Sequence, residues 1–279
     1  KPNSMQTIPD RTFAAVLGSP IEHSLSPVLH SAAYQVLGLN WAYEKYDVTE
    51  AVFAETLAAL PSRCVGLSLT MPLKDVAFEV AACHDEAAQL TGACNTLVRD
   101  GQSWRGFNTD VPGFISALTR ATVSTIDEAL VLGAGATARS AVAALQLMGA
   151  GRVHIAARRL DAIDEIRRMF PDIAVVAHSL DDLGNSSALV INTLPGSVAD
   201  SIVLPPSCTA LFDVIYAPWP TALALKAGNR KVLGGLDLLV AQAVEQVLLM
   251  TNVGSDRRED LYTAMYAAGL VEQVKRSQH

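Results

Sequence analysis

The sequence feature that most constrains the fold is the glycine-rich run LVLGAGATARS at residues 130–140. The apolar residues 129–132 predict a strand, and the alanine-rich continuation predicts a helix, so the glycines fall in the turn between them. Gly133 permits a tight turn, and Gly135 lets backbone amides approach a phosphate without an intervening Cβ. Ala138 takes the third position of the pattern, in a helix whose first amides favour anions. The run indicates a dinucleotide pyrophosphate site, although the same pattern alone is as typical of a structural turn.

Two arginines, Arg158 and Arg159, follow the next apolar run at residues 153–157. An enzyme that uses NAD usually places an acidic residue at this distance, where it binds the ribose hydroxyls. A guanidinium group pairs instead with the 2′-phosphate that distinguishes NADP, so the arginines favour NADP. The alternative is a solvated basic start to the following helix.

The spacing of apolar runs predicts two α/β domains. Helical stretches of crossover length separate most of the short β-rich runs after residue 122, which predicts a parallel, doubly wound sheet. Those runs lie at residues 129–132, 153–157, 173–176, 189–191 and 211–214. An earlier alternation of strands and helices begins at residue 13 and closes near an expected loop at residues 106–110.

These patterns place the domain boundaries. We expect an N-terminal α/β substrate domain at residues 1–112 and a Rossmann nucleotide-binding domain at residues 113–235. Helical patterns from residue 235 to 250 and from residue 259 to 273 fit no further strand–helix unit. We expect residues 236–279 to return to the first domain, an assignment that rests partly on the family resemblance given below.

Charge and composition exclude several classes of function. The formal net charge is -7 and no basic stripe stands out, which argues against nucleic-acid binding. No apolar run approaches the roughly 18–20 residues that span a bilayer, and no signal-peptide core is apparent, so we expect no membrane association. The cysteines are scattered without a Cys-x-x-Cys pair, which predicts no metal site and a cytoplasmic protein.

Four clusters in the first domain carry groups suited to a small polyhydroxylated acid, at residues 19–27, 68–74, 92–96 and 106–110. In the first cluster, Ser24 and Ser26 are spaced by one residue and could face one anion together. Ser26 is as readily explained as the cap of a helix that starts at Pro27.

Lys74 and Asp110 are the candidate catalytic pair. A lysine can change its protonation state when desolvated, although most lysines are solvated surface groups. Asp110 follows a turn-rich segment, where a helix N-cap is the alternative role. A nearby carboxylate would orient the ammonium group while the lysine protonates the oxygen left by hydride addition.

Together these clusters resemble the shikimate dehydrogenase family. The resemblance rests on GSPIEHSLSP (18–27), SLTMPLK (68–74), GACNT (92–96), NTD (108–110) and LDLLVAQ (236–242), in the correct order around a Rossmann unit. It spans nearly the entire chain. It implies reversible, NADPH-dependent reduction of 3-dehydroshikimate to shikimate in aromatic amino-acid biosynthesis, by a monomer or homodimer, with substrate and cofactor meeting in a cleft between the domains.

The resemblance also implies roles for individual residues. Lys74 and Asp110 would be catalytic. Ser24, Ser26 and Tyr216 would bind the substrate carboxylate, and Ser68, Thr70, Lys74, Asn95, Asp110 and Gln242 would surround its ring oxygens. The cofactor would contact Gly133, Gly135, Ala136, Thr137, Ala138, Arg139, Arg158, Arg159, Thr193, Val214, Gly235 and Leu238.

This chain departs from the family pattern at three places. Ser68 stands where relatives often have Asn, Ala136 replaces a frequent glycine, and Leu238 replaces a common Met. A serine is shorter than an asparagine and offers fewer hydrogen-bonding groups, which puts the contact with a ring hydroxyl in question. Gln242 could alternatively be only the polar face of an apolar helix.

Two other functions are consistent with the sequence. A quinate/shikimate dehydrogenase of broader specificity would prefer an acidic residue near position 158 or 159. A non-catalytic sensor of a metabolite could keep the fold without the chemistry, but the presence of Lys74 and Asp110 argues against it.

Overall fold

The computed structural model describes residues 8–123, 125–185 and 187–278. The chain forms two compact units. Unit 1 runs to Thr109 and adds Gln242–Glu272, and unit 2 comprises Asp110–Ala241 and the residues from Gln273 onward. Helix α10 (Gly235–Thr251) belongs to unit 1 from Gln242, and helix α11 (Arg258–Ser277) belongs to it as far as Glu272.

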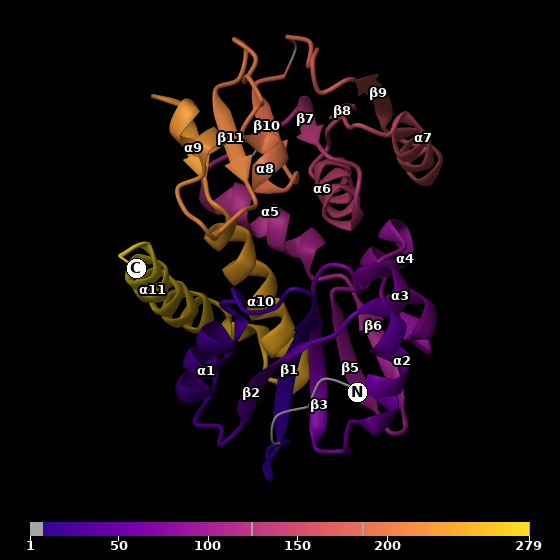
Figure 1. Cartoon of the computed structure of the whole chain (residues 1–279), viewed down its shortest axis with the longest axis vertical. Helices are drawn as coiled ribbons and strands as arrows, with labels where there is room; N and C mark the ends of the chain where they lie inside the picture. Colours follow the sequence, from indigo (N-terminus) through magenta and orange to yellow (C-terminus); the bar gives the residue numbers. More distant parts are fainter. Residues whose placement is uncertain (1–7, 124, 186, 279) are drawn as a thin grey trace. The chain divides into compact units, whose positions relative to one another are not determined.

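Unit 1 is an α/β layer structure around a six-stranded sheet of order β2-β1-β3-β5-β6-β4 (Figure 1). Strands β1, β2 and β3 are parallel, whereas β5 is antiparallel to both β3 and β6. The elements are β1 (Phe13–Gly18), α1 (Ser26–Leu37), β2 (Ala42–Asp47), α2 (Glu50–Ala59), β3 (Cys64–Leu69), α3 (Lys74–Val80), β4 (Cys83–His84), α4 (Glu86–Thr91), β5 (Thr96–Asp100), β6 (Ser103–Phe107) and a 3₁₀ turn at Ser255–Arg257.

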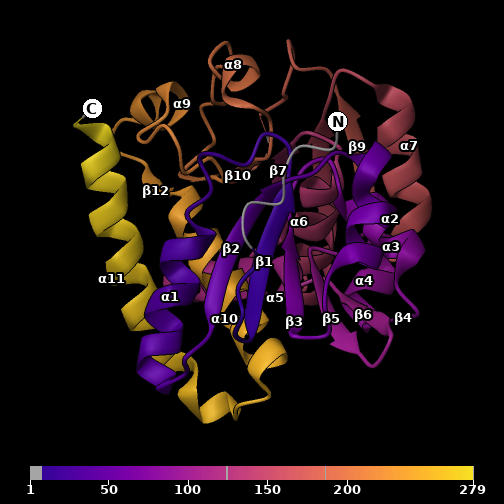
Figure 2. The same ribbon diagram turned by 60° about the horizontal axis from the view of Figure 1, so that its bottom comes forward.

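Both faces of this sheet are buried, as the continuous apolar run of β1 requires. Phe13, Ala15 and Leu17 share one hydrophobic cluster with residues of α2 and α3, while Ala14 and Val16 pack on the other face with residues of α1 and α10. Figure 2 shows α11 running alongside α1. The β3 face that carries Ser68 is therefore the face covered by α10.

The expected loop at residues 106–110 is wrong in part. Strand β6 continues through Phe107, and helix α5 (Asp110–Arg120) already begins at Asp110. Strands β5 and β6 form a hairpin whose turn contains Gly101 at φ 59°, a left-handed conformation that favours glycine. The hairpin escaped prediction because Gly106, where an added Cβ would meet the Cys94 sulfur, looks like a loop residue in the sequence.

Unit 2 confirms the doubly wound expectation. Its six strands are all parallel, in the order β12-β11-β10-β7-β8-β9, so the sheet reverses direction of growth between β7 and β10. Besides α5, its elements are β7 (Glu128–Leu132), α6 (Ala136–Leu147), β8 (Arg152–Ala156), α7 (Leu160–Met169), β9 (Ala174–His178), β10 (Leu189–Asn192), α8 (Gly196–Ala199), β11 (Ala210–Asp213), α9 (Ala222–Lys226) and β12 (Lys231–Leu233).

Residues of β7 are buried on both faces of this second sheet. Leu130 and Leu132 join the cluster that includes Leu223 of α9. Helices α5 and α6 pack against each other, and Phe114 of α5 meets Phe212 of β11 edge-on, with ring centroids 5.4 Å apart. Among the described residues, none of the helices is long and apolar enough to cross a membrane.

Candidate active site

The predicted anion-binding serines lie at the start of α1. Ser24 and Ser26 are both buried, and the Ser24 hydroxyl accepts a hydrogen bond from the Ser26 backbone amide at 3.3 Å. Helix α1 begins at Ser26 itself, and the capping position belongs to Leu25. Ser26 is therefore not the N-cap that its sequence position suggested, and its hydroxyl is available for another role.

Asn95 is the centre of a buried hydrogen-bond cluster in unit 1. Its Oδ1 accepts from the backbone N–H of Thr109 at 2.8 Å, and its Nδ2 donates to Oε1 of Gln242 at 3.2 Å. Asn95 and Gln242 are only 2% and 7% exposed. Gln242 is thus held by a specific hydrogen bond to Asn95. It is therefore more than a polar residue on one face of an apolar helix.

A second set of bonds connects Ser68 to α10. The Ser68 hydroxyl bonds Oε1 of Gln246 at 2.7 Å, and Tyr43 bonds Ser68 at 2.6 Å. His30 stacks on Tyr43 with ring centroids 3.9 Å apart, and burial lowers the pKa of His30 to about 3, so its ring is neutral. The structure therefore places Ser68 within a continuous polar chain in the interior of unit 1.

Lys74 is the first residue of α3, and its carbonyl accepts from the backbone amide of Cys94 at 2.9 Å. That bond joins the second and third sequence clusters. Thr70, at the carboxyl end of β3, bonds β1 through its backbone amide and the Leu17 carbonyl at 3.0 Å. Asp110 is 5% exposed at the first position of α5, directly after Thr109 of the Asn95 cluster.

The glycine-rich turn of unit 2 has the form that a pyrophosphate site requires. Gly133 has φ 107°, and an added Cβ would collide with the Thr193 side chain. Gly135 is the N-cap of α6, and nothing lies within 4 Å of the position that its Cβ would take. The turn therefore opens the first amides of α6, including Ala136 and Thr137, to an anion.

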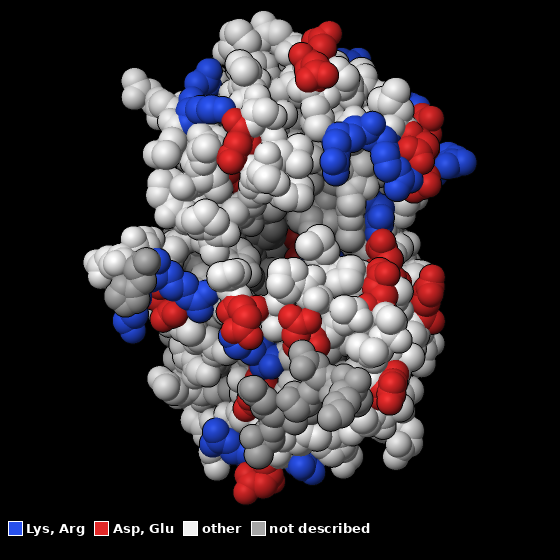
Figure 3. Space-filling model, viewed as in Figure 1, with Lys and Arg blue, Asp and Glu red and all other residues white. Residues whose placement is uncertain are grey.

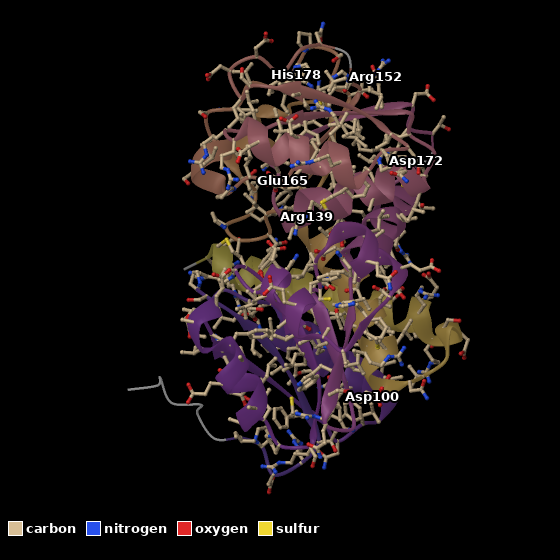
Figure 4. The ribbon with its side chains drawn as sticks, turned by 90° about the vertical axis from the view of Figure 1, so that its right-hand side faces the viewer. Asp100, Arg139, Arg152, Glu165, Asp172 and His178 are labelled. Atoms are coloured by element: carbon tan, nitrogen blue, oxygen red, sulfur yellow. The ribbon has the colours of Figure 1, made fainter. Side chains whose placement is uncertain are left out.

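The two arginines after β8 differ in their surroundings. Arg159 bonds Asp161 at 2.7 Å, whereas Arg158 makes no ion pair among the described residues. Acidic and basic side chains intermingle over α7, as Figure 3 shows for this side of unit 2. Arg139 lies in the first turn of α6, at the opposite end of unit 2 from Arg152 (Figure 4). Of the two arginines, Arg158 has the freer guanidinium for a phosphate.

The remaining predicted cofactor residues gather at the carboxyl ends of β10 and β11. Thr193 donates through its hydroxyl to the Leu132 carbonyl at 2.7 Å, and Val214 donates through its amide to the Asn192 carbonyl at 3.1 Å. Gly235 has backbone atoms of residues 214–216 where a Cβ would stand, so no larger residue fits. Leu238 is buried one turn into α10. The Tyr216 carbonyl accepts from Gln273 at 2.8 Å.

Sequence reasoning missed several members of the polar clusters. Thr96 and Thr109 lie inside two of the family motifs, but the motifs alone did not indicate a role for them. Tyr43 lies in no motif. Gln246 could have been found, because it follows Gln242 by one helical turn and must share its face. Within the described parts of the chain, no group of His, Cys, Asp and Glu is arranged to hold a metal ion.

The parallel sheet with its glycine turn defines unit 2 as a dinucleotide-binding α/β domain. Residues 16–97 of unit 1 match the family model described as the shikimate dehydrogenase substrate binding domain. The NADP(+)-dependent shikimate dehydrogenase of Nostoc sp. is 31% identical over 251 residues, which cover 82% of this chain and 87% of that protein. That of Geobacter metallireducens is 33% identical over 81% of this chain and 86% of that protein.

Solved structures give the same result. The Mycobacterium tuberculosis shikimate dehydrogenase aligns with a TM-score of 0.81 at 34% identity, over 92% of this chain and 99% of that one. A Thermus thermophilus shikimate 5-dehydrogenase in complex with NADP(H) and shikimate aligns with a TM-score of 0.79 at 30% identity, over 92% and 99%. This chain belongs to the shikimate dehydrogenase family.

Proposed function

We propose that this protein is an NADP-dependent shikimate dehydrogenase that reversibly reduces 3-dehydroshikimate to shikimate. The observation that carries the proposal is the buried cluster of Asn95, Thr109 and Gln242, in a chain of this family. Buried amides with fixed orientation recognise a ring that carries several hydroxyl groups, and they discriminate against ligands that leave them unpaired.

The proton chemistry falls to Lys74, with Asp110 as its partner. The lysine ammonium donates a proton to the substrate oxygen that receives negative charge, and the carboxylate orients that ammonium. Ser24, Ser26 and Tyr216 hold the substrate carboxylate. Ser68, Thr70, Asn95 and Gln242 take the ring oxygens. These assignments extend the family resemblance to individual positions of this chain.

The residues of unit 2 fit NADP. Gly133 forms a tight turn that a residue with a Cβ could not form without a collision, and the first amides of α6 are open to the pyrophosphate. Ala138 and Arg139 lie in the same helical turn. Arg158 suits the 2′-phosphate, Arg159 borders it, and Thr193, Val214, Gly235 and Leu238 line the nicotinamide side. When bound, NADPH supplies the hydride, and these residues hold and orient the cofactor.

The direct test is the formation of NADPH from NADP and shikimate by the purified protein, followed by its absorbance. Equal rates with NAD, or with quinate in place of shikimate, would favour the broader quinate/shikimate enzyme. If shikimate stabilised the protein against heat but produced no NADPH, a metabolite sensor would replace the enzyme.

We further infer a cytoplasmic protein that acts as a monomer or homodimer. Its four cysteines are all unpaired, which suits a reducing compartment. Light scattering at several protein concentrations distinguishes a monomer from a dimer.

A further inference from the structure

The hydrogen-bond chain around Ser68 has a direction that backbone groups determine. Gln246 donates from Nε2 to the carbonyl of Asn95 at 3.3 Å, and a carbonyl can only accept. The Gln246 amide is therefore oriented with Oε1 toward Ser68 and His30. Because Oε1 is also only an acceptor, the Ser68 hydroxyl must donate its single proton to it, across 2.7 Å.

Tyr43 occupies a second position on the Ser68 oxygen. Burial raises the pKa of Tyr43 well above its ordinary value, so the phenol keeps its proton and donates it to Ser68 at 2.6 Å. One chain of hydrogen bonds therefore runs from Tyr43 through Ser68 to Gln246.

The donor and acceptor count of Ser68 follows. A serine hydroxyl has one proton and two lone pairs. The proton goes to Gln246, one lone pair accepts from Tyr43, and a single lone pair remains. Toward a ligand, Ser68 can therefore only accept, whereas an asparagine side chain carries both donors and an acceptor.

We propose that Tyr43 and Gln246 are positioning residues that make Ser68 a hydrogen-bond acceptor toward the substrate, so that this position selects a ring hydroxyl over any group that cannot donate. The inference rests on the proposed function. To the proposed function it adds the reason for a preference for a ring hydroxyl, and two residues, Tyr43 and Gln246, that were not among the expected substrate contacts.

The first experiment removes the two partners of the contact in turn. Wild type and Ser68→Ala are compared with shikimate and with analogues that each lack a different non-reacting ring hydroxyl. We expect Ser68→Ala to lower kcat/KM for shikimate by about tenfold, and to have no effect on the analogue that lacks the facing hydroxyl. An equal loss on every substrate would overturn the proposal, because it would show that Ser68 acts only through the fold.

The second experiment measures the polarity of the contact. Fluorine in place of the facing hydroxyl can accept weakly but cannot donate, so wild type should treat the fluoro and deoxy analogues alike. Gln246→Met releases the Ser68 proton toward the ligand, and the fluoro analogue should then be preferred by about fivefold. A wild-type preference for the fluoro analogue means that Ser68 donates, and contradicts the proposal. The wild-type comparison decides the question even if Gln246→Met does not fold.

Tyr43→Phe tests the other end of the chain. It leaves Ser68 with one fewer partner, and we expect KM for shikimate to rise by about threefold to fivefold with kcat unchanged. Tyr34→Phe is the matched control, because the buried Tyr34 hydroxyl of the same cluster has no hydrogen-bond partner among the described residues. Equal KM changes in the two variants would remove Tyr43 from the chain.

These measurements separate this inference from the proposed function. Absence of NADPH formation by wild type with shikimate refutes the proposed function alone. In that event the same affinity ratios are measured by calorimetry with shikimate and its analogues, and they decide the role of Ser68 independently.

Discussion

The groups that we propose to bind substrate in unit 1 are mostly buried side chains with fixed partners, whereas those that we propose to bind cofactor in unit 2 are mainly backbone amides and exposed guanidinium groups. Asn95 is 2% exposed and bonded on both ends of its amide, while Arg158 is exposed and makes no ion pair among the described residues. Fixed buried donors discriminate between small neutral groups, because a wrong partner leaves one of them unsatisfied. A charged phosphate, in contrast, can be bound by an exposed guanidinium group at the surface, because the attraction between the charges does not require fixed buried partners.

The largest effect that this comparison predicts is on turnover. Lys74→Ala removes the side chain that we propose as the proton donor, and kcat should fall by about a thousandfold while the affinity for NADP stays nearly unchanged. Steady-state kinetics and a separate binding titration with NADP measure the two quantities. Lys275→Ala, at an exposed lysine in the last turn of α11, is the control and should keep full activity. Undiminished turnover in Lys74→Ala would remove its catalytic role.

Arg158→Ala should change only the discrimination between cofactors. We expect kcat/KM for NADP to fall by about 10- to 100-fold, with little change for NAD, which lacks the 2′-phosphate. Rates with both cofactors, measured on the same preparation, give the ratio. A parallel loss for NADP and NAD would mean that Arg158 supports the fold rather than the phosphate.

Burial in unit 1 should also make stability depend on pH. His30 is neutral in the folded protein because its pKa is lowered to about 3, against 6.5 in the unfolded chain. Below the unfolded pKa only the unfolded chain gains the proton, so stability is present above it and is lost as the pH falls. The loss between about pH 8 and about pH 5 should be about 2 kcal/mol, which urea unfolding can measure.

The control for this pH dependence is a second histidine. His30→Phe should remove the loss, whereas His23→Gln, at an exposed position, should retain it. If His30→Phe unfolds with the wild-type pH dependence, another group is responsible.

The smallest expected effect is at Arg159. Its guanidinium already pairs with Asp161, so Arg159→Ala should change kcat/KM for NADP by no more than about threefold. Equal losses in Arg158→Ala and Arg159→Ala would show that the two arginines act as one site.

The sequence allowed the Rossmann unit to be predicted better than the first unit. Short parallel strands and a glycine turn leave local signals, and residues 130–140 contain both. The β5–β6 hairpin did not, because Gly106 is required by close packing against Cys94, which depends on residues distant in the sequence. Of the site, the motif residues could be named, but the partners of Ser68 could not. Tyr43 and Gln246 are 25 and 178 positions from it, and only the fold brings them together.

The bond from Gln246 to the Asn95 carbonyl also has a consequence for how this site can diverge. A backbone carbonyl is present whatever residue occupies position 95, so mutation there does not reverse the chain. A change of preference at the Ser68 position therefore requires a change at position 246, in a helix far along the sequence. We expect the residues at these two positions to change together in evolution. Replacing Ser68 by asparagine alone should therefore impair substrate binding in this protein.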